Sequence, residues 1–160
     1  MGLVNDPAQQ AASAYMNWLR KPGSEQALEK DNFRVMEQFM LGMGEQPEWF
    51  DAAIRERYHA CWRRGLTGGV NYYRASPLHP PTAEDAGAAR LSLDPSNFQV
   101  RVPVRVIWGE KDKALLPSLL DGLEDLVDDL KIERLPNASH WVVHEYPAII
   151  NECLHRFLSE

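Results

Sequence analysis

The chain has 160 residues, of which 44% are hydrophobic, and it carries a formal net charge of −6. This length suffices for one domain or two very small ones, and the hydrophobic fraction is that of a packed protein rather than a disordered one. The acidic balance argues against nucleic acid as a partner, because phosphate binding needs a basic surface. No apolar run is long enough to cross a membrane, and the first residues resemble no signal or transit peptide. We therefore expect a cytoplasmic protein with no membrane partner.

The first part of the chain, residues 7 to 74, has the pattern of several helices separated by short breaks. Asp6 can cap a helix that Pro7 opens, and Ala11, Tyr15, Trp18 and Leu19 then share one face. Further helices are expected from Ser24 to Leu28, from Asp31 through Met40, from Pro47 to about Arg64, and from Val70 to Arg74.

Residues 75 to 103 are rich in proline and small polar residues, which is typical of a connecting segment. Beyond them the pattern alternates between strand and helix. Strands are predicted at 104–108 and 132–135, and Pro117 and Pro147 each open a helix. The first of these helices should carry the apolar stripe Leu119, Leu120, Leu123, Leu126 and Val127.

This alternation predicts an α/β fold with parallel strands. Two strands do not make a stable sheet, so we expect an incomplete parallel sheet whose other strands lie outside this sequence. The predicted division is a helical domain at 1–92 and a strand–helix–strand–helix unit at 93–160.

Two residues that follow the predicted strands could carry chemistry. Asp112 comes just after the first strand and His140 just after the second. Because sites in such sheets form at the carboxyl ends of strands, these side chains should meet. A carboxylate that holds an imidazole fixes the ring's tautomer and stabilises its protonated form. For either residue alone, a polar turn or a capping histidine is the simpler interpretation, but the pair together favours catalysis.

The surrounding residues resemble a known family. Val106 to Asp112, then Leu135 to Trp141, and then Glu145-Tyr146-Pro147 look like the C-terminal end of the α/β-hydrolase fold. That family has the chain order nucleophile, acid, histidine. The resemblance implies that Asp112 is the acid and His140 the general base, with no cofactor.

The helical front part resembles the cap of the epoxide-hydrolase-like branch of this family. Ala14 to Gly23 looks like the first cap segment, and Gly69 to Arg74 looks like the second. By this resemblance Tyr15 and Tyr73 would hydrogen-bond the epoxide oxygen, as neutral donors to a developing alkoxide. Tyr72 is the alternative to Tyr73, and both tyrosines could instead belong to the core of the cap. Trp18 and Trp141 are expected beside the substrate.

The sequence departs from the family pattern in what it lacks. It contains neither a Gly-x-Ser-x-Gly elbow nor its equivalent with Asp, and no His-Gly-x-Pro segment for an oxyanion hole. We therefore expect the chain to be an inactive fragment of an epoxide-hydrolase-like enzyme that acts on a small apolar or epoxide-type substrate. An Asp nucleophile would imply an epoxide hydrolase or dehalogenase, and a Ser an esterase. The alternatives are a non-catalytic ligand-binding remnant, and a chain that self-associates or pairs with a chain carrying the missing half.

His140 and His144 lie four residues apart, but no third ligand is nearby, so we do not expect a metal.

Overall fold

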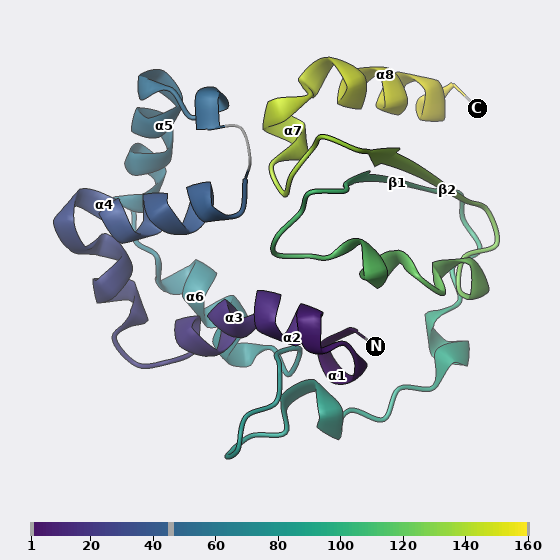
Figure 1. Cartoon of the computed structure of the whole chain (residues 1–160), viewed down its shortest axis with the longest axis horizontal. Coiled ribbons are helices and arrows are strands. Elements are labelled where there is room, and N and C mark those ends of the chain that lie inside the picture. Colours follow the sequence, from purple (N-terminus) through teal and green to yellow (C-terminus); the bar gives the residue numbers. More distant parts are fainter. Residues whose placement is uncertain (1, 45–46, 160) are drawn as a thin grey trace. The chain divides into compact units, whose positions relative to one another are not determined.

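The computed structural model describes residues 2–44 and 47–159 of the chain (Figure 1). The described residues form two compact units, one of residues 2–42 and 47–91 and the other of residues 43–44 and 92–159. The role of the first unit as a cap stays a prediction.

The first unit is built from helices and short 3₁₀ turns. In chain order these are α1 Gly2–Asn5, α2 Pro7–Ala12, α3 Ala14–Leu19, α4 Ser24–Gly42, η1 Pro47–Trp49, α5 Ala52–Trp62, α6 Thr67–Ala75 and η2 Gly87–Arg90. Two aspartates begin helices as the sequence suggests for this residue type. The Asp6 carboxylate accepts hydrogen bonds from the N–H groups of Ala8 and Gln9, at 2.9 and 3.3 Å.

Two of the expected helices are interrupted. The helix that Pro7 opens does not run through to Leu19 but breaks at Ser13, whose hydroxyl accepts a 2.7 Å hydrogen bond from the buried amide of Gln9. A serine hydroxyl that forms a hydrogen bond within its own segment competes with the main-chain hydrogen bonds of the helix. The helix expected from Pro47 is also wrong in its first part. Asp51 is extended and caps α5 by accepting from the N–H of Ile54 at 2.8 Å, so the continuous helix starts only at Ala52.

The kink inside α4 agrees with the expected break before Asp31. Asp31, Asn32 and Phe33 have left-handed backbone angles, with φ of 53°, 54° and 64°. Asp and Asn tolerate this region better than other residues, whereas Phe33 does so at a cost. The buried ring of Phe33 packs on Trp62, with ring centroids 5.6 Å apart, and this burial offsets the strain.

The second unit contains the sheet. Its elements are η3 Pro95–Phe98, β1 Val104–Gly109, η4 Pro117–Leu120, η5 Leu123–Asp125, β2 Leu130–Leu135, α7 Val142–Glu145 and α8 Pro147–Leu158. The two strands are parallel, in register from Val104 opposite Leu130 to Gly109 opposite Leu135. In the described residues the sheet has these two strands alone, as expected for an incomplete sheet.

The helix predicted to start at Pro117 is absent. Two short 3₁₀ turns take its place, because Asp121 is extended and Gly122 has a left-handed φ of 83°. The leucine stripe is therefore split between two turns. Leu120 and Val127 are still buried, which explains why the apolar spacing looks helical.

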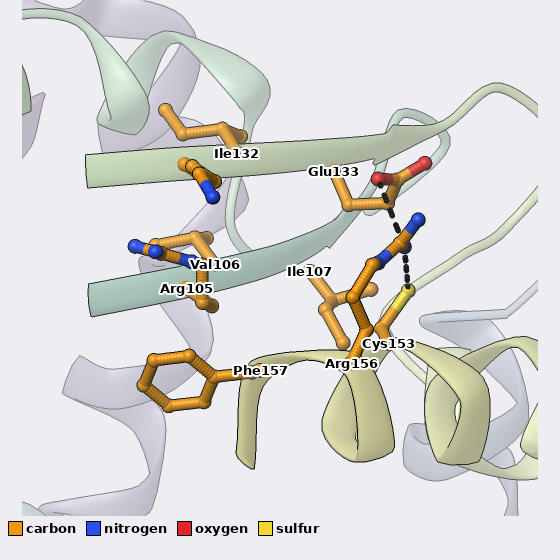
Figure 2. Close-up of a pocket in the computed structure, with 9 residues that line it drawn as sticks. Arg105, Val106, Ile107, Ile132, Glu133, Cys153, Arg156 and Phe157 are labelled. Atoms are coloured by element: carbon orange, nitrogen blue, oxygen red, sulfur yellow. Dashed lines mark hydrogen bonds and ion pairs between the residues drawn. The ribbon is translucent and has the colours of Figure 1, made fainter. Parts of the chain in front are cut away.

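A cavity of about 260 Å³ lies between the two strands and α8 (Figure 2). Figure 2 shows Val106 and Ile107 of β1 on one side and Phe157 of α8 on the other. The Arg105 guanidinium lies 5.1 Å from the centre of the Phe157 ring. The strand residues that line this cavity come from the body of β1 and β2, so it is separate from the strands' carboxyl ends.

None of the helices in residues 2–44 and 47–159 combines the length and apolar character that crossing a bilayer requires.

Candidate active site

Asp112 lies in the turn that follows β1, and both oxygens of its carboxylate have hydrogen-bond partners. Oδ1 accepts hydrogen bonds from the N–H groups of Ala114 and Leu115, both at 2.8 Å. The residue is 8% exposed. These main-chain donors fix the carboxylate and leave Oδ2 directed at a second partner.

That partner is His140, which follows β2. Its Nδ1 lies 2.9 Å from Oδ2 of Asp112, and the contact predicted from the sequence is thus present. An ionised carboxylate can only accept, so Nδ1 carries the proton and Nε2 is the basic nitrogen of the neutral ring. The imidazole side chain is 28% exposed, so a base on this ring is open to a reactant.

The carboxyl end of β1 touches the loop that carries His140. The Lys111 N–H donates to the carbonyl of Ala138 at 2.9 Å. A Cβ added to Gly109 would stand 2.4 Å from the carbonyl oxygen of Ser139 and 2.5 Å from that of Ala138. Only a residue without a side chain permits this approach, so Gly109 brings the two site loops together.

Trp141 adjoins the imidazole. Its ring meets that of His140 edge to face, with centroids 5.1 Å apart and an interplanar angle of 85°. This places an apolar wall beside the base. The other predicted substrate neighbour, Trp18, lies in α3 of the first unit and is half-buried.

The two tyrosines singled out in the sequence are brought together within the first unit. The rings of Tyr15 on α3 and Tyr73 on α6 are 6.0 Å apart at an angle of 77°. Burial raises the pKa of the Tyr73 phenol, and a hydrogen bond with Tyr15 opposes that rise. Tyr72, the alternative to Tyr73, is 71% exposed.

An apolar cavity of about 130 Å³ adjoins Tyr73. Residues of α3, α4 and α6 line it, together with the residue that precedes α6. They are Leu19, Leu28, Met36, Phe39, Leu66, Gly69 and Val70. Phe39 also stacks edge to face on Tyr15 at 5.1 Å. Nothing in the sequence pattern points to Phe39 as a neighbour of Tyr15, because the two residues lie on different helices with no shared motif.

Among the residues that the structure describes, no three His, Cys, Asp or Glu side chains are grouped so as to hold a metal ion.

Comparison with known proteins gives no matching family model but several relatives. The AB hydrolase superfamily protein YfhM of Bacillus subtilis is 27% identical over 155 residues, which are 95% of this chain and 50% of that protein. An epoxide hydrolase of Caballeronia sordidicola is 34% identical over 144 residues, 86% of this chain and 40% of that protein. The chain spans about half the length of the curated relatives it matches.

Comparison with solved structures also finds epoxide hydrolases. The crystal structure of an epoxide hydrolase of Bacillus megaterium, in complex with an inhibitor, superposes with a TM-score of 0.85 at 30% identity. The match covers 99% of this chain and 55% of that one. The expected α/β-hydrolase fold is thereby confirmed. The relatives and structural neighbours of this chain are thus epoxide hydrolases and a member of the AB hydrolase superfamily, which it matches over about half of their length.

Proposed function

We propose that this chain supplies the cap and the acid–base half of the active site of an epoxide hydrolase. The observation that carries the proposal is the 2.9 Å contact between His140 Nδ1 and Asp112 Oδ2 at the carboxyl ends of two parallel strands. The relatives named as epoxide hydrolases support the choice of reaction over an esterase or dehalogenase.

In the proposed reaction, a carboxylate nucleophile from a segment outside these 160 residues opens the epoxide and forms an ester. Tyr15 and Tyr73 donate hydrogen bonds to the epoxide oxygen; as its bond to the attacked carbon breaks, the oxygen takes a proton from one of these phenols and stays on the neighbouring carbon as a hydroxyl. His140 Nε2 then takes a proton from water, and the hydroxide formed attacks the ester carbonyl. Asp112 stabilises the imidazolium in between, and the imidazolium proton then returns through solvent to the deprotonated tyrosine, which leaves the diol and the regenerated carboxylate.

The proposed substrate is an epoxide with a compact apolar substituent. The cavity beside Tyr73 has a volume of about 130 Å³ and an apolar lining. An apolar cavity of roughly 150 Å³ accepts benzene. We therefore propose that a compact apolar group, no larger than a phenyl ring, is accommodated next to the Tyr73 phenol, and that Trp18 and Trp141 are substrate-binding residues.

The test compares the chain alone with a chimera. The purified 160-residue chain should not hydrolyse styrene oxide or aryl esters, because the bond-forming residue is missing. The chimera places this chain after the part of the Bacillus megaterium enzyme that the chain does not match. This chimera should hydrolyse styrene oxide. His140→Gln should lower that turnover about a thousandfold or more.

His144→Gln is the matched control, since it removes a neighbouring imidazole that does not contact Asp112 in the described structure. It should keep turnover near that of the parent chimera. Turnover that survives His140→Gln, or hydrolysis by the isolated chain that His140→Ala abolishes, would contradict the proposed division of labour.

A second candidate role is association with another chain. A two-stranded parallel sheet leaves strand edges without a neighbour, and such edges pair readily. The partner would be a chain carrying the remaining strands, or a second copy of this one. A cytoplasmic location stays a prediction from the sequence.

A further inference from the structure

The residue before His140 is held by a single carboxylate. Ser139 is 1% exposed. Its N–H donates to Glu145 Oε2 at 2.7 Å, and its hydroxyl donates to Glu145 Oε1 at 2.6 Å. Both polar groups of a buried serine thus depend on Glu145, and these charge-assisted bonds are the strong kind.

The residue after His140 is held by the same segment. The Trp141 N–H donates to the Ser139 hydroxyl oxygen at 3.2 Å. The Trp141 carbonyl, which precedes α7, accepts from the N–H of Glu145, the last residue of that helix, at 3.0 Å. Glu145 therefore closes a ring of hydrogen bonds around His140, with its side chain on one flank and its main chain on the other.

The loop has little room to adjust on its other side. Ala138 is fully buried, and its carbonyl accepts from Lys111. If Glu145 were removed, the Ser139 N–H and hydroxyl would be left buried without their acceptors, which favours opening of the loop. Opening would carry the imidazole away from Asp112, because His140 lies between Ser139 and Trp141.

We propose that Glu145 is a positioning residue that keeps Nδ1 of His140 on Asp112. Its importance for catalysis rests on the proposed function, whereas its effect on the Asp112–His140 bond does not. The site thus contains a second carboxylate, which acts on the histidine through its loop rather than on the ring.

The test is nuclear magnetic resonance of the 160-residue chain with ¹⁵N-labelled histidine. In the unsubstituted chain, the Nδ1–H proton bonded to Asp112 should give a low-field resonance that exchanges slowly with water. Glu145→Ala should speed that exchange about tenfold or more, the effect of losing a charge-assisted hydrogen bond. Glu145→Gln should fall between, because its amide oxygen can still accept from the Ser139 N–H.

Two controls separate positioning from general loss of stability. Backbone N–H exchange in the β1–β2 ladder serves as the reference, because global destabilisation would accelerate it equally. Glu152→Gln on α8 removes the same charge from an exposed side chain and should change nothing.

If Glu145→Ala does not fold, Ser139→Ala tests whether the contact between Glu145 and Ser139 positions His140. It keeps the main-chain bond to Glu145 but removes the hydroxyl contacts, so the Nδ1–H exchange should rise about threefold. A folded Glu145→Ala, or a Ser139→Ala, with the parent's resonance and exchange rate would overturn the proposal. Neither result bears on epoxide hydrolysis, which the chimera tests separately.

Discussion

At the scale of single residues, the Arg74 side chain joins several groups of the first unit. Its guanidinium binds both carboxylate oxygens of Glu25, and it also donates to the Ser24 hydroxyl at 3.3 Å and to the Lys21 carbonyl at 3.2 Å. Arg74 lies in the last turn of α6 and Glu25 in the first turn of α4, so the pair joins two helices next to the Tyr73 cavity. A bidentate arginine–carboxylate pair has a defined geometry, unlike most surface ion pairs.

This pair predicts a specific acid sensitivity. The hydrogen bonds from Arg74 lower the pKa of Glu25 from 4.5 to about 2. A carboxyl with a lower pKa in the folded state stabilises the fold above its unfolded pKa and loses that contribution as the pH falls toward the folded value. Arg74→Met should therefore flatten the fall in the free energy of unfolding between about pH 4.5 and 2.

The measurement is urea unfolding at several pH values. Arg34→Met is the control, because Arg34 pairs with Asp31 at 3.4 Å on the open surface, where both side chains are more than half exposed. It should leave the pH dependence unchanged. Equal slopes for the parent chain and Arg74→Met would show that the Glu25 contact does not persist in solution.

At the scale of elements, the end of β1 is fitted against the loop that follows β2. The contact depends on Gly109, since a Cβ there would come within 2.4 to 2.7 Å of backbone atoms of Ala138 and Ser139. Backbone atoms cannot move aside as a flexible side chain can, so a larger residue must push the two loops apart.

Gly109→Ala is accordingly expected to lower the free energy of unfolding by roughly 1–3 kcal/mol, the usual cost of overpacking. Because the displaced loop carries His140, the low-field Nδ1–H resonance should weaken as well. Gly68→Ala on α6 is the matched control, where a new Cβ meets nothing within 4 Å. It should be neutral or stabilise by up to about 1 kcal/mol. A Gly109→Ala chain as stable as its parent would be incompatible with this close approach.

At the scale of the whole molecule, the edge of β1 that faces away from β2 is the feature from which we predict association. Val104 and Glu110 of the β1 segment donate to β2-side carbonyls, at 2.8 and 3.1 Å. Alternation along the strand then directs the N–H of Ile107 away from β2. In the described residues β1 pairs with β2 alone, so this edge is available to another strand.

We expect the isolated chain to self-associate as its concentration rises, measured by gel filtration with light scattering. Ile107→Pro should reduce that association, because it removes an edge donor without breaking the β1–β2 ladder. Val106→Pro is the comparison, since the N–H of Val106 belongs to that ladder. This substitution should unfold the sheet, as measured by circular dichroism. A strictly monomeric parent chain would contradict the edge as the site of association.

The sequence by itself determined the elements that local chemistry encodes. Asp6 with Pro7 marks a helix start, the strand positions follow from the apolar runs, and Asp112 and His140 stand at strand ends because polar residues follow those runs. Apolar spacing alone does not establish a helix. The leucine stripe after Pro117 has helical spacing, yet Gly122 divides it into two turns.

Only the tertiary structure decided which side chains meet. Phe39 stacks on Tyr15, Arg74 binds Glu25, and Glu145 binds both polar groups of Ser139. Spacing along the chain does not encode such contacts, because they depend on how separate elements pack once their apolar faces are buried. The sequence therefore predicts Asp112 as the acid and His140 as the base, while the fold supplies the Glu145 carboxylate that binds the histidine's loop.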